Sequence, residues 1–158
     1  MNPVSNASQA LYLDDLRVGQ RFDSAEYQME AERMKAFAAE FDPQPFHTDE
    51  AAAEHTILRG LVASGWHTAA ATMRLLITGG LPIAGGTIGL SAEMAWPSPV
   101  RPGDTLRVES EILEITPSRS KPNQGIVRVR SVTVNQKGEQ VQLLTTKILI
   151  YKRPKPAE

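Results

Sequence analysis

The segment over residues 42–47, Asp-Pro-Gln-Pro-Phe-His, contains the residues best suited to proton-transfer chemistry. An imidazole changes its protonation near neutral pH and a carboxyl does so in acid, so Asp42 and His47 together could give and take a proton. The two intervening prolines prevent a helix from continuing, because proline fixes φ and lacks an amide donor. The spacing therefore predicts a rigid loop that presents an acid–base pair. Alone, either residue is more often a turn carboxylate or a hydrogen-bonded loop histidine.

Helical patterns lie on both sides of this segment. Apolar residues at positions 34, 37, 38 and 41 recur at helical spacing and predict an amphipathic helix over residues 29–41. Thr48 could cap a short helix over residues 49–54. The mostly apolar stretch over residues 66–78 predicts a central helix enclosed on nearly all sides, with Met73 in the core.

Most of the β-branched, alternating sequence lies in the second half of the chain. It predicts four consecutive strands joined by turns, after one short strand near the N-terminus. Helices first and strands afterwards indicate an α+β domain in which one face of a curved antiparallel sheet, a meander, packs on the central helix. The expected strands cover residues 21–27, 86–95, 105–115, 126–135 and 140–151.

Composition restricts the class of protein. The 158 residues, 41% of them hydrophobic, suit one domain, which we expect over residues 10–152 between a flexible N-terminus over residues 1–9 and a tail over residues 153–158. Seventeen basic and eighteen acidic residues give a net charge of −1, so nothing indicates binding to nucleic acid or to an anionic membrane. Cysteine is absent, which excludes thiol chemistry, and no run approaches the roughly 20 apolar residues of a membrane span. We expect a cytoplasmic protein.

The three histidines give no metal-binding pattern. They stand at positions 47, 55 and 67, and no two of them fall on one face of a single predicted helix, so no metal is predicted. His55 is expected in solvent. His67 could line a site at the start of the central helix, but a core-facing or capping role is favoured.

Three stretches carry a family resemblance. Residues 37–49, FAAEFDPQPFHTD, resemble the hydratase motif of the MaoC-like dehydratases, which include (R)-specific enoyl-CoA hydratases. Residues 60–68, GLVASGWHT, resemble the entry to the central helix of that family, and residues 99–106, PVRPGDTL, its turn into a later strand. The resemblance extends from about residue 11 to residue 153. It departs from the commoner pattern at Gln44, where Asn is usual.

The resemblance implies a fold, an activity and a minimal assembly. The fold is the hotdog fold, an antiparallel sheet wrapped around a long central helix, and the minimal unit is a homodimer. The activity is the interconversion of trans-2-enoyl-CoA and (3R)-3-hydroxyacyl-CoA, in fatty acid metabolism. Coenzyme A or acyl carrier protein would carry the substrate, with no further cofactor.

Roles for individual residues follow from this chemistry. His47 would take a proton from the attacking water, and Asp42 could act as the acid if apolar surroundings or a shared proton kept it protonated. The amide of Gly65, at the start of the central helix, would stabilise negative charge on the thioester oxygen. Ser64 would assist there or only cap the helix.

Further substrate contacts are expected around this centre and at cationic loops. They are Gln44, Phe46, Ser64 and Trp66 near the reacting atoms, with Arg101 and Arg119 as partners for phosphates of coenzyme A; for each arginine, a solvated loop charge is the alternative.

Two other functions stay open. A hotdog thioesterase commonly has a carboxylate on or near the central helix, and residues 66–78 contain none. A silent subunit that binds acyl thioesters or a partner protein would fit the departure at Gln44, although such a subunit has little need for Asp42 and His47 together.

Overall fold

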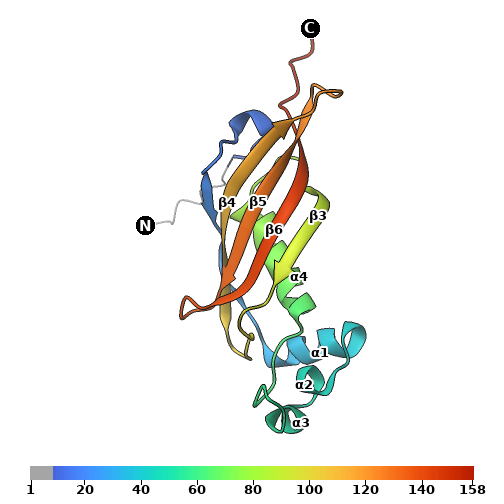
Figure 1. The fold of residues 1–158 in the computed structure, drawn as a ribbon, viewed down its shortest axis with the longest axis vertical. Coiled ribbons are helices and arrows are strands. Elements are labelled where there is room, and N and C mark those ends of the chain that lie inside the picture. Colours follow the sequence, from blue (N-terminus) through green and yellow to red (C-terminus); the bar gives the residue numbers. More distant parts are fainter. Residues whose placement is uncertain (1–8) are drawn as a thin grey trace.

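The computed structural model describes residues 9–158, so the flexible terminus predicted over residues 1–9 lies almost wholly outside the described residues. Helical elements occupy the first half of the chain and the long strands occupy the second (Figure 1). The helical elements are η1 (Leu13–Asp15), α1 (Ala31–Phe41), α2 (Pro45–Thr48), α3 (Glu50–Glu54), α4 (Gly65–Leu75) and η2 (Leu76–Gly80). The strands are β1 (Arg21–Asp23), β2 (Tyr27–Gln28), β3 (Ile88–Ala95), β4 (Thr105–Pro117), β5 (Gln124–Val134) and β6 (Gln140–Tyr151).

The strands form one antiparallel sheet in the order β1-β4-β5-β6-β3, and β2 also pairs with β4. β4, β5 and β6 follow one another as hairpins, as predicted. The expected four-strand meander is wrong for β3, which pairs with β6 at the opposite edge from β1. The segment between β3 and β4 contains three prolines at positions 97, 99 and 102, and it crosses the sheet instead of turning back.

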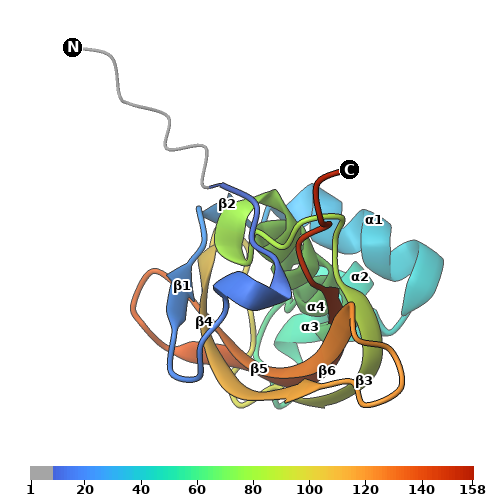
Figure 2. The ribbon, with the colours of Figure 1, turned by 90° about the horizontal axis from the view of Figure 1, so that it is seen from above.

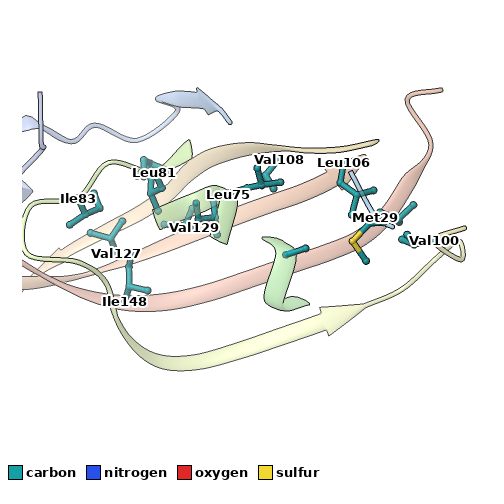
Figure 3. Close-up of a cluster of buried hydrophobic side chains, with 14 of the residues drawn as sticks. Met29, Leu75, Leu81, Ile83, Val100, Leu106, Val108, Val127, Val129 and Ile148 are labelled. Carbon is teal, nitrogen blue, oxygen red and sulfur yellow. The ribbon is translucent and has the colours of Figure 1, made fainter. Parts of the chain in front are cut away.

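The sheet curls around α4, which confirms the hotdog fold (Figure 2). On β5, buried residues alternate with more exposed ones, because successive side chains of a strand point to opposite faces. Val127 and Val129 therefore face the same side as Ile148 on β6, and Leu75 of α4 belongs to the same buried cluster (Figure 3). Burial of this apolar surface holds α4 in place.

The central helix differs from its prediction in extent and in burial. It begins at Gly65, ends as an α-helix at Leu75, and continues as the wider turn η2, where Gly79 takes a φ of 139°. Enclosure on nearly all sides was a wrong expectation, since the sheet covers only one face of α4. Met73, expected in the core, is 46% exposed, and Trp66 is also exposed.

The segment over residues 42–47, expected to be a loop, contains more helix than predicted. Residues Pro45–Thr48 form the single turn α2 in place of a loop, because proline is favoured at the first position of a helix. Asp49, not Thr48, caps α3, with Oδ1 accepting from the amide of Ala52 at 3.0 Å. In residues 9–158, no helix is long and apolar enough to cross a membrane.

Candidate active site

The carboxyl of Asp42 and the imidazole of His47 meet where α1 ends and α2 begins. Nε2 of His47 lies 3.3 Å from Oδ2 of Asp42. Asp42 is the residue that terminates α1, and its amide still donates to the carbonyl of Ala38 at 2.9 Å. The turn of α2, opened by Pro45, brings His47 back toward Asp42. The two side chains that the sequence paired are therefore in contact in the fold.

His47 is oriented through its other ring nitrogen. Nδ1 lies 2.8 Å from the carbonyl oxygen of Val62, and the residue is only 7% exposed. A carbonyl oxygen only accepts, so Nδ1 donates this hydrogen bond. Phe46 packs edge-on against the imidazole, with ring centroids 4.6 Å apart. The two contacts hold Nε2 toward the carboxyl of Asp42.

Hydrogen-bond donors surround the carboxyl of Asp42. Oδ2 accepts from the hydroxyl of Ser64 at 2.7 Å, and Oδ1 accepts from the side-chain Nε2 of Gln44 at 2.7 Å. The bond from Ser64 lowers the pKa of Asp42 below its ordinary value, against the opposing effect of burial, with smaller lowering effects from Gln44 and from His47. Asp42 is therefore a carboxylate at neutral pH. These are not the apolar surroundings that an acid at this position would require.

Ser64 and Gly65 join this pair to the start of the central helix. Ser64 is fully buried and caps α4, with its hydroxyl accepting from the amide of Trp66 while donating to Asp42. Gly65 is the first residue of α4, and within residues 9–158 its amide has no hydrogen-bond acceptor. A Cβ at this position would lie 2.6 Å from the ring of Trp96. Glycine is therefore required here by packing, and its free amide lies beside the residue that binds Asp42.

A chain of polar contacts fixes Trp96 against the helix start. Its indole Nε1 donates to Oε1 of Gln142 at 3.0 Å, and Nε2 of Gln142 donates to the hydroxyl of Thr72 at 3.1 Å. That hydroxyl also lies 2.6 Å from the hydroxyl of Thr133 on β5. Because the buried members satisfy one another, the network holds Trp96 over Gly65 rigidly.

A small cavity of about 150 Å³ opens beside Gly65. The two tryptophans Trp66 and Trp96 meet there edge to face, with ring centroids 5.4 Å apart. Ala63 and Val141 add apolar surface. The cavity therefore borders Gly65 with mostly apolar side chains. Among residues 9–158, no group of three or more histidine, aspartate or glutamate side chains is placed to hold a metal.

Comparison with known proteins identifies the family. The family model of the MaoC like domain matches residues 15–135. The chain belongs to the MaoC-like dehydratase family. The YdeM protein of Bacillus subtilis (strain 168) is 35% identical over 133 residues, which cover 82% of this chain and 91% of YdeM.

Solved MaoC-like structures agree with the fold. A MaoC-like dehydratase from Rhodospirillum rubrum is 58% identical with a TM-score of 0.91, covering 92% of this chain and 100% of that one. The R-hydratase PhaJ1 from Pseudomonas aeruginosa is 30% identical with a TM-score of 0.74, covering 94% and 93%. The family resemblance expected from the sequence is thereby confirmed.

Four of the predicted substrate contacts lie around the centre of this MaoC-like domain. Gln44 and Ser64 bind Asp42 directly, and Phe46 packs on His47. Trp66 is 60% exposed at the mouth of the small cavity.

The two predicted arginine contacts lie elsewhere. Arg101 holds the loop before α4, since its guanidinium donates to the carbonyl of Leu58 at 2.6 Å and to that of Gly60 at 3.3 Å. Arg119 is exposed in the turn between β4 and β5, at the end of the sheet away from α1, α2 and α3 (Figure 1). In a single chain, neither arginine is placed beside Asp42.

The sequence did not identify two contributors to this site. The carbonyl of Val62, which fixes the tautomer of His47, leaves no signal because every residue has a carbonyl. Trp96 was missed because its contact with Gly65 joins positions distant in the chain. Its only signal was a large aromatic residue between a strand and three prolines.

Proposed function

We propose that this chain is a hydratase/dehydratase that interconverts trans-2-enoyl and (3R)-3-hydroxyacyl thioesters, carried by coenzyme A or acyl carrier protein. The supporting observation is the contact between Asp42 and His47 beside the free amide of Gly65. The MaoC-like family, and the 30% identity to a protein named as an R-hydratase, support the same reaction class.

In the hydration direction, the site would act on a water placed between the two titratable side chains. Nε2 of His47 takes one proton as the oxygen attacks the β carbon, and the carboxylate of Asp42 accepts the other water hydrogen and balances the charge of the imidazolium. Electrons move through the α carbon to the thioester oxygen, where the amide of Gly65 donates a hydrogen bond. The imidazolium then returns its proton to the α carbon. Dehydration runs through the same steps in reverse, and the carrier is the only cofactor needed.

The lowered pKa of Asp42 supports a division of roles within the pair. A carboxylate held by Ser64 and Gln44 is a poor proton donor, so it orients the water and stabilises the charged ring. His47 has one nitrogen fixed on Val62 and the other free to exchange a proton, which suits a group that must first take and then give one.

We also propose a homodimer, because α4, η2 and the edge strand β3 all expose large apolar side chains. α4 exposes Trp66 and Met73, and η2, which continues it, exposes Ile77. The edge strand β3 exposes Ile88 and Leu90. β3 is an edge strand whose outer backbone groups are free to pair. A second copy related by a two-fold axis would pair its own β3 antiparallel with this one and cover both helices. Leu90→Glu should convert the dimer to a monomer in sedimentation equilibrium, and an unchanged dimer would contradict this arrangement.

The function is tested with crotonyl-CoA and longer enoyl-CoA esters. Purified protein should remove the absorbance of the conjugated enoyl thioester, with a hydroxyacyl-CoA as product and no free thiol. Release of free thiol from acyl-CoA would instead indicate a thioesterase, although α4 contains no carboxylate. Binding of acyl-CoA without turnover of any ester would indicate a silent binding subunit and would refute the proposal.

A further inference from the structure

The chain enters α4 through residues 59–64, which have no regular secondary structure but contact both titratable side chains of the candidate site. The carbonyl of Val62 accepts from Nδ1 of His47 at 2.8 Å. The hydroxyl of Ser64 donates to Oδ2 of Asp42 at 2.7 Å. The position of this entry segment therefore sets how the imidazole and the carboxylate face each other.

The entry segment is buried at residues 61–64, so its backbone groups need partners within the protein. Outside helices and sheets, those partners must come from other loops or from side chains. The amide of Val62 donates to the carbonyl of Phe46 at 3.1 Å. The amide of Ala63 donates to the carbonyl of Val100 at 2.9 Å. The second of these partners lies on the segment that joins β3 to β4.

Arg101, on that same joining segment, holds the beginning of the entry. Its Nη2 donates to the carbonyl of Leu58 at 2.6 Å and its Nη1 to the carbonyl of Gly60 at 3.3 Å. A guanidinium presents its donors in a rigid planar fork, so one side chain fixes two carbonyls relative to each other. In residues 9–158 this guanidinium forms no ion pair, and the two carbonyls are its hydrogen-bond partners.

The backbone between the two carbonyls has an uncommon conformation. Arg59 has a φ of 52°, in the left-handed region that favours glycine, and Gly60 has a φ of 137°. A residue other than glycine stays in that region only where the surrounding contacts hold it. The hydrogen bonds from Arg101 provide such contacts on both sides of Arg59.

Arg101 is itself fixed through its backbone. Its amide donates to Oδ2 of Asp104 at 2.9 Å, and Oδ1 of Asp104 accepts from Nε2 of Gln136 at 2.9 Å. Asp104 is buried. Trp96, at the other end of the segment between β3 and β4, packs on Gly65. This one segment therefore supports the entry to α4 at two points.

We propose that Arg101 is a positioning residue for the hydratase reaction, which keeps the carbonyl of Val62 on Nδ1 of His47. The inference rests on the proposed function. Without the guanidinium, the carbonyls of Leu58 and Gly60 would turn toward water and the entry segment would gain freedom. His47 would then lose its carbonyl partner for part of the time, and a ring with its proton on Nε2 cannot accept one from water.

Steady-state kinetics on crotonyl-CoA separates this role from the contact with coenzyme A phosphates that the sequence predicted for Arg101. Arg101→Met removes both donors, and kcat should fall by roughly 10- to 100-fold with KM within a few-fold of wild type, because a displaced proton-transfer group slows the reaction without weakening binding. Arg101→Lys should recover only part of kcat, because an ammonium lacks the fork. Where Arg101→Met does not fold, Arg101→Lys carries the measurements. A raised KM with unchanged kcat would overturn the proposal.

Arg153→Met is the matched control for lost packing and lost hydrogen bonds. Arg153 also joins two segments, since Nη2 donates to Oδ2 of Asp15 at 2.7 Å and its amide donates to Oδ2 of Asp14 at 2.8 Å. It follows β6, at the end of the molecule opposite α1, α2 and α3 (Figure 1). Both variants should be less stable in urea, but under conditions where both are folded only Arg101→Met should lose kcat. Equal kcat values in the two variants would overturn the proposal.

An NMR signal of His47 tests the proposal without turnover. In protein labelled with ¹⁵N at histidine, the Nδ1 proton that is bound to the carbonyl of Val62 should exchange slowly with water and give a resolved signal. His47→Gln identifies this signal by its loss. The signal should broaden or disappear in Arg101→Met and Arg101→Lys, and it should persist in Arg153→Met. An unchanged signal in both Arg101 variants overturns the proposal.

The same spectra distinguish failure of this inference from failure of the proposed function. If wild-type protein converts no enoyl thioester, the proposed function fails. Loss of the His47 signal in the Arg101 variants, but not in Arg153→Met, then still supports the positioning of His47 by Arg101. Persistence of the signal in the Arg101 variants of an active enzyme overturns the positioning role and leaves the hydratase function intact.

Discussion

Two buried histidines lie near the start of α4, and their surroundings differ. His47 is 7% exposed and His67 is 8% exposed, so burial alone does not separate them. His47 has a carbonyl on one nitrogen and the carboxylate of Asp42 near the other. His67 is stacked flat on Phe37, with centroids 4.6 Å apart, and within residues 9–158 its buried Nδ1 has no hydrogen-bond partner.

The difference sets what each ring can do with a proton. Burial, and secondarily the charge of Arg33, lower the pKa of His67, so this ring stays neutral. His47 lies against a carboxylate that can offset a positive charge on the ring. Hydrogen-bond partners, and not the depth of burial, therefore distinguish the two imidazoles.

Replacing His47 should have the largest effect. His47→Ala removes the group that takes and returns the proton, and kcat/KM for the enoyl thioester should fall by roughly 10²- to 10⁴-fold. The assay is loss of the enoyl absorbance, with circular dichroism to confirm folding. His67→Phe is the matched control and should stay within a few-fold of wild type. Equal losses in the two variants would remove the distinction between the histidines.

Gly65→Ala tests the start of α4. The new Cβ would lie 2.6 to 2.9 Å from three atoms of the Trp96 ring, so the ring or the amide must shift. Displacing an oxyanion donor should lower kcat by roughly 10²- to 10³-fold. Overpacking should reduce the free energy of unfolding by about 1–3 kcal/mol.

The stability and rate effects of Gly65→Ala can be separated by a second substitution. Trp96→Leu in the same chain opens the space and should recover most of the lost stability in denaturant unfolding. A wild-type kcat in Gly65→Ala alone would exclude the amide from catalysis.

The sequence predicted the contact between Asp42 and His47 because the prolines between them are local information. Pro43 and Pro45 lie between Asp42 and His47, and helical spacing predicted a helix over residues 29–41, where α1 covers Ala31–Phe41. The same prolines also led to the wrong expectation of a loop after residue 42. Proline is favoured at the first position of a helix, and Pro45 begins α2. Alternation similarly located β4, β5 and β6 to within a few residues.

What the sequence could not give are contacts between distant positions. The pairing of β3 with β6, the hydrogen bond from His47 to Val62, and the packing of Trp96 on Gly65 each join segments far apart in the chain. The open face of α4 was missed for a related reason. The sequence of an apolar helix predicts burial on all sides whether its own chain or a second chain packs against it.

Ser64→Ala should affect His47 indirectly, by changing the pKa of Asp42, the carboxylate that His47 contacts. The variant loses the cap of α4, worth about 1 kcal/mol, and the hydrogen bond that contributes most to the lowered pKa of Asp42. That pKa should rise, so the acid limb of the pH–rate profile should move to higher pH.

The stability of Ser64→Ala should also depend on pH in a defined direction. A carboxyl whose pKa is lowered on folding stabilises the protein above its ordinary pKa, here 3.8, and this stabilisation is lost as pH falls through the folded value. The deficit of the variant should therefore be largest at neutral pH and shrink below about pH 4. Ser118→Ala, on the β4–β5 turn, is the control and should show no such trend.

His67→Phe should have the smallest effect, seen mainly in stability and only in acid. The unfolded chain protonates this histidine as pH falls below its ordinary pKa of 6.5, whereas the folded chain resists until the lowered value is reached. Wild-type protein therefore loses stability across that window, and the phenylalanine variant, which cannot bind a proton and keeps the stack on Phe37, should lose less. Urea unfolding at pH 7 and pH 5 measures the difference. An equal loss of stability in the two proteins would show that folding does not lower the pKa of His67. Burial without a hydrogen-bond partner would then no longer distinguish His67 from His47.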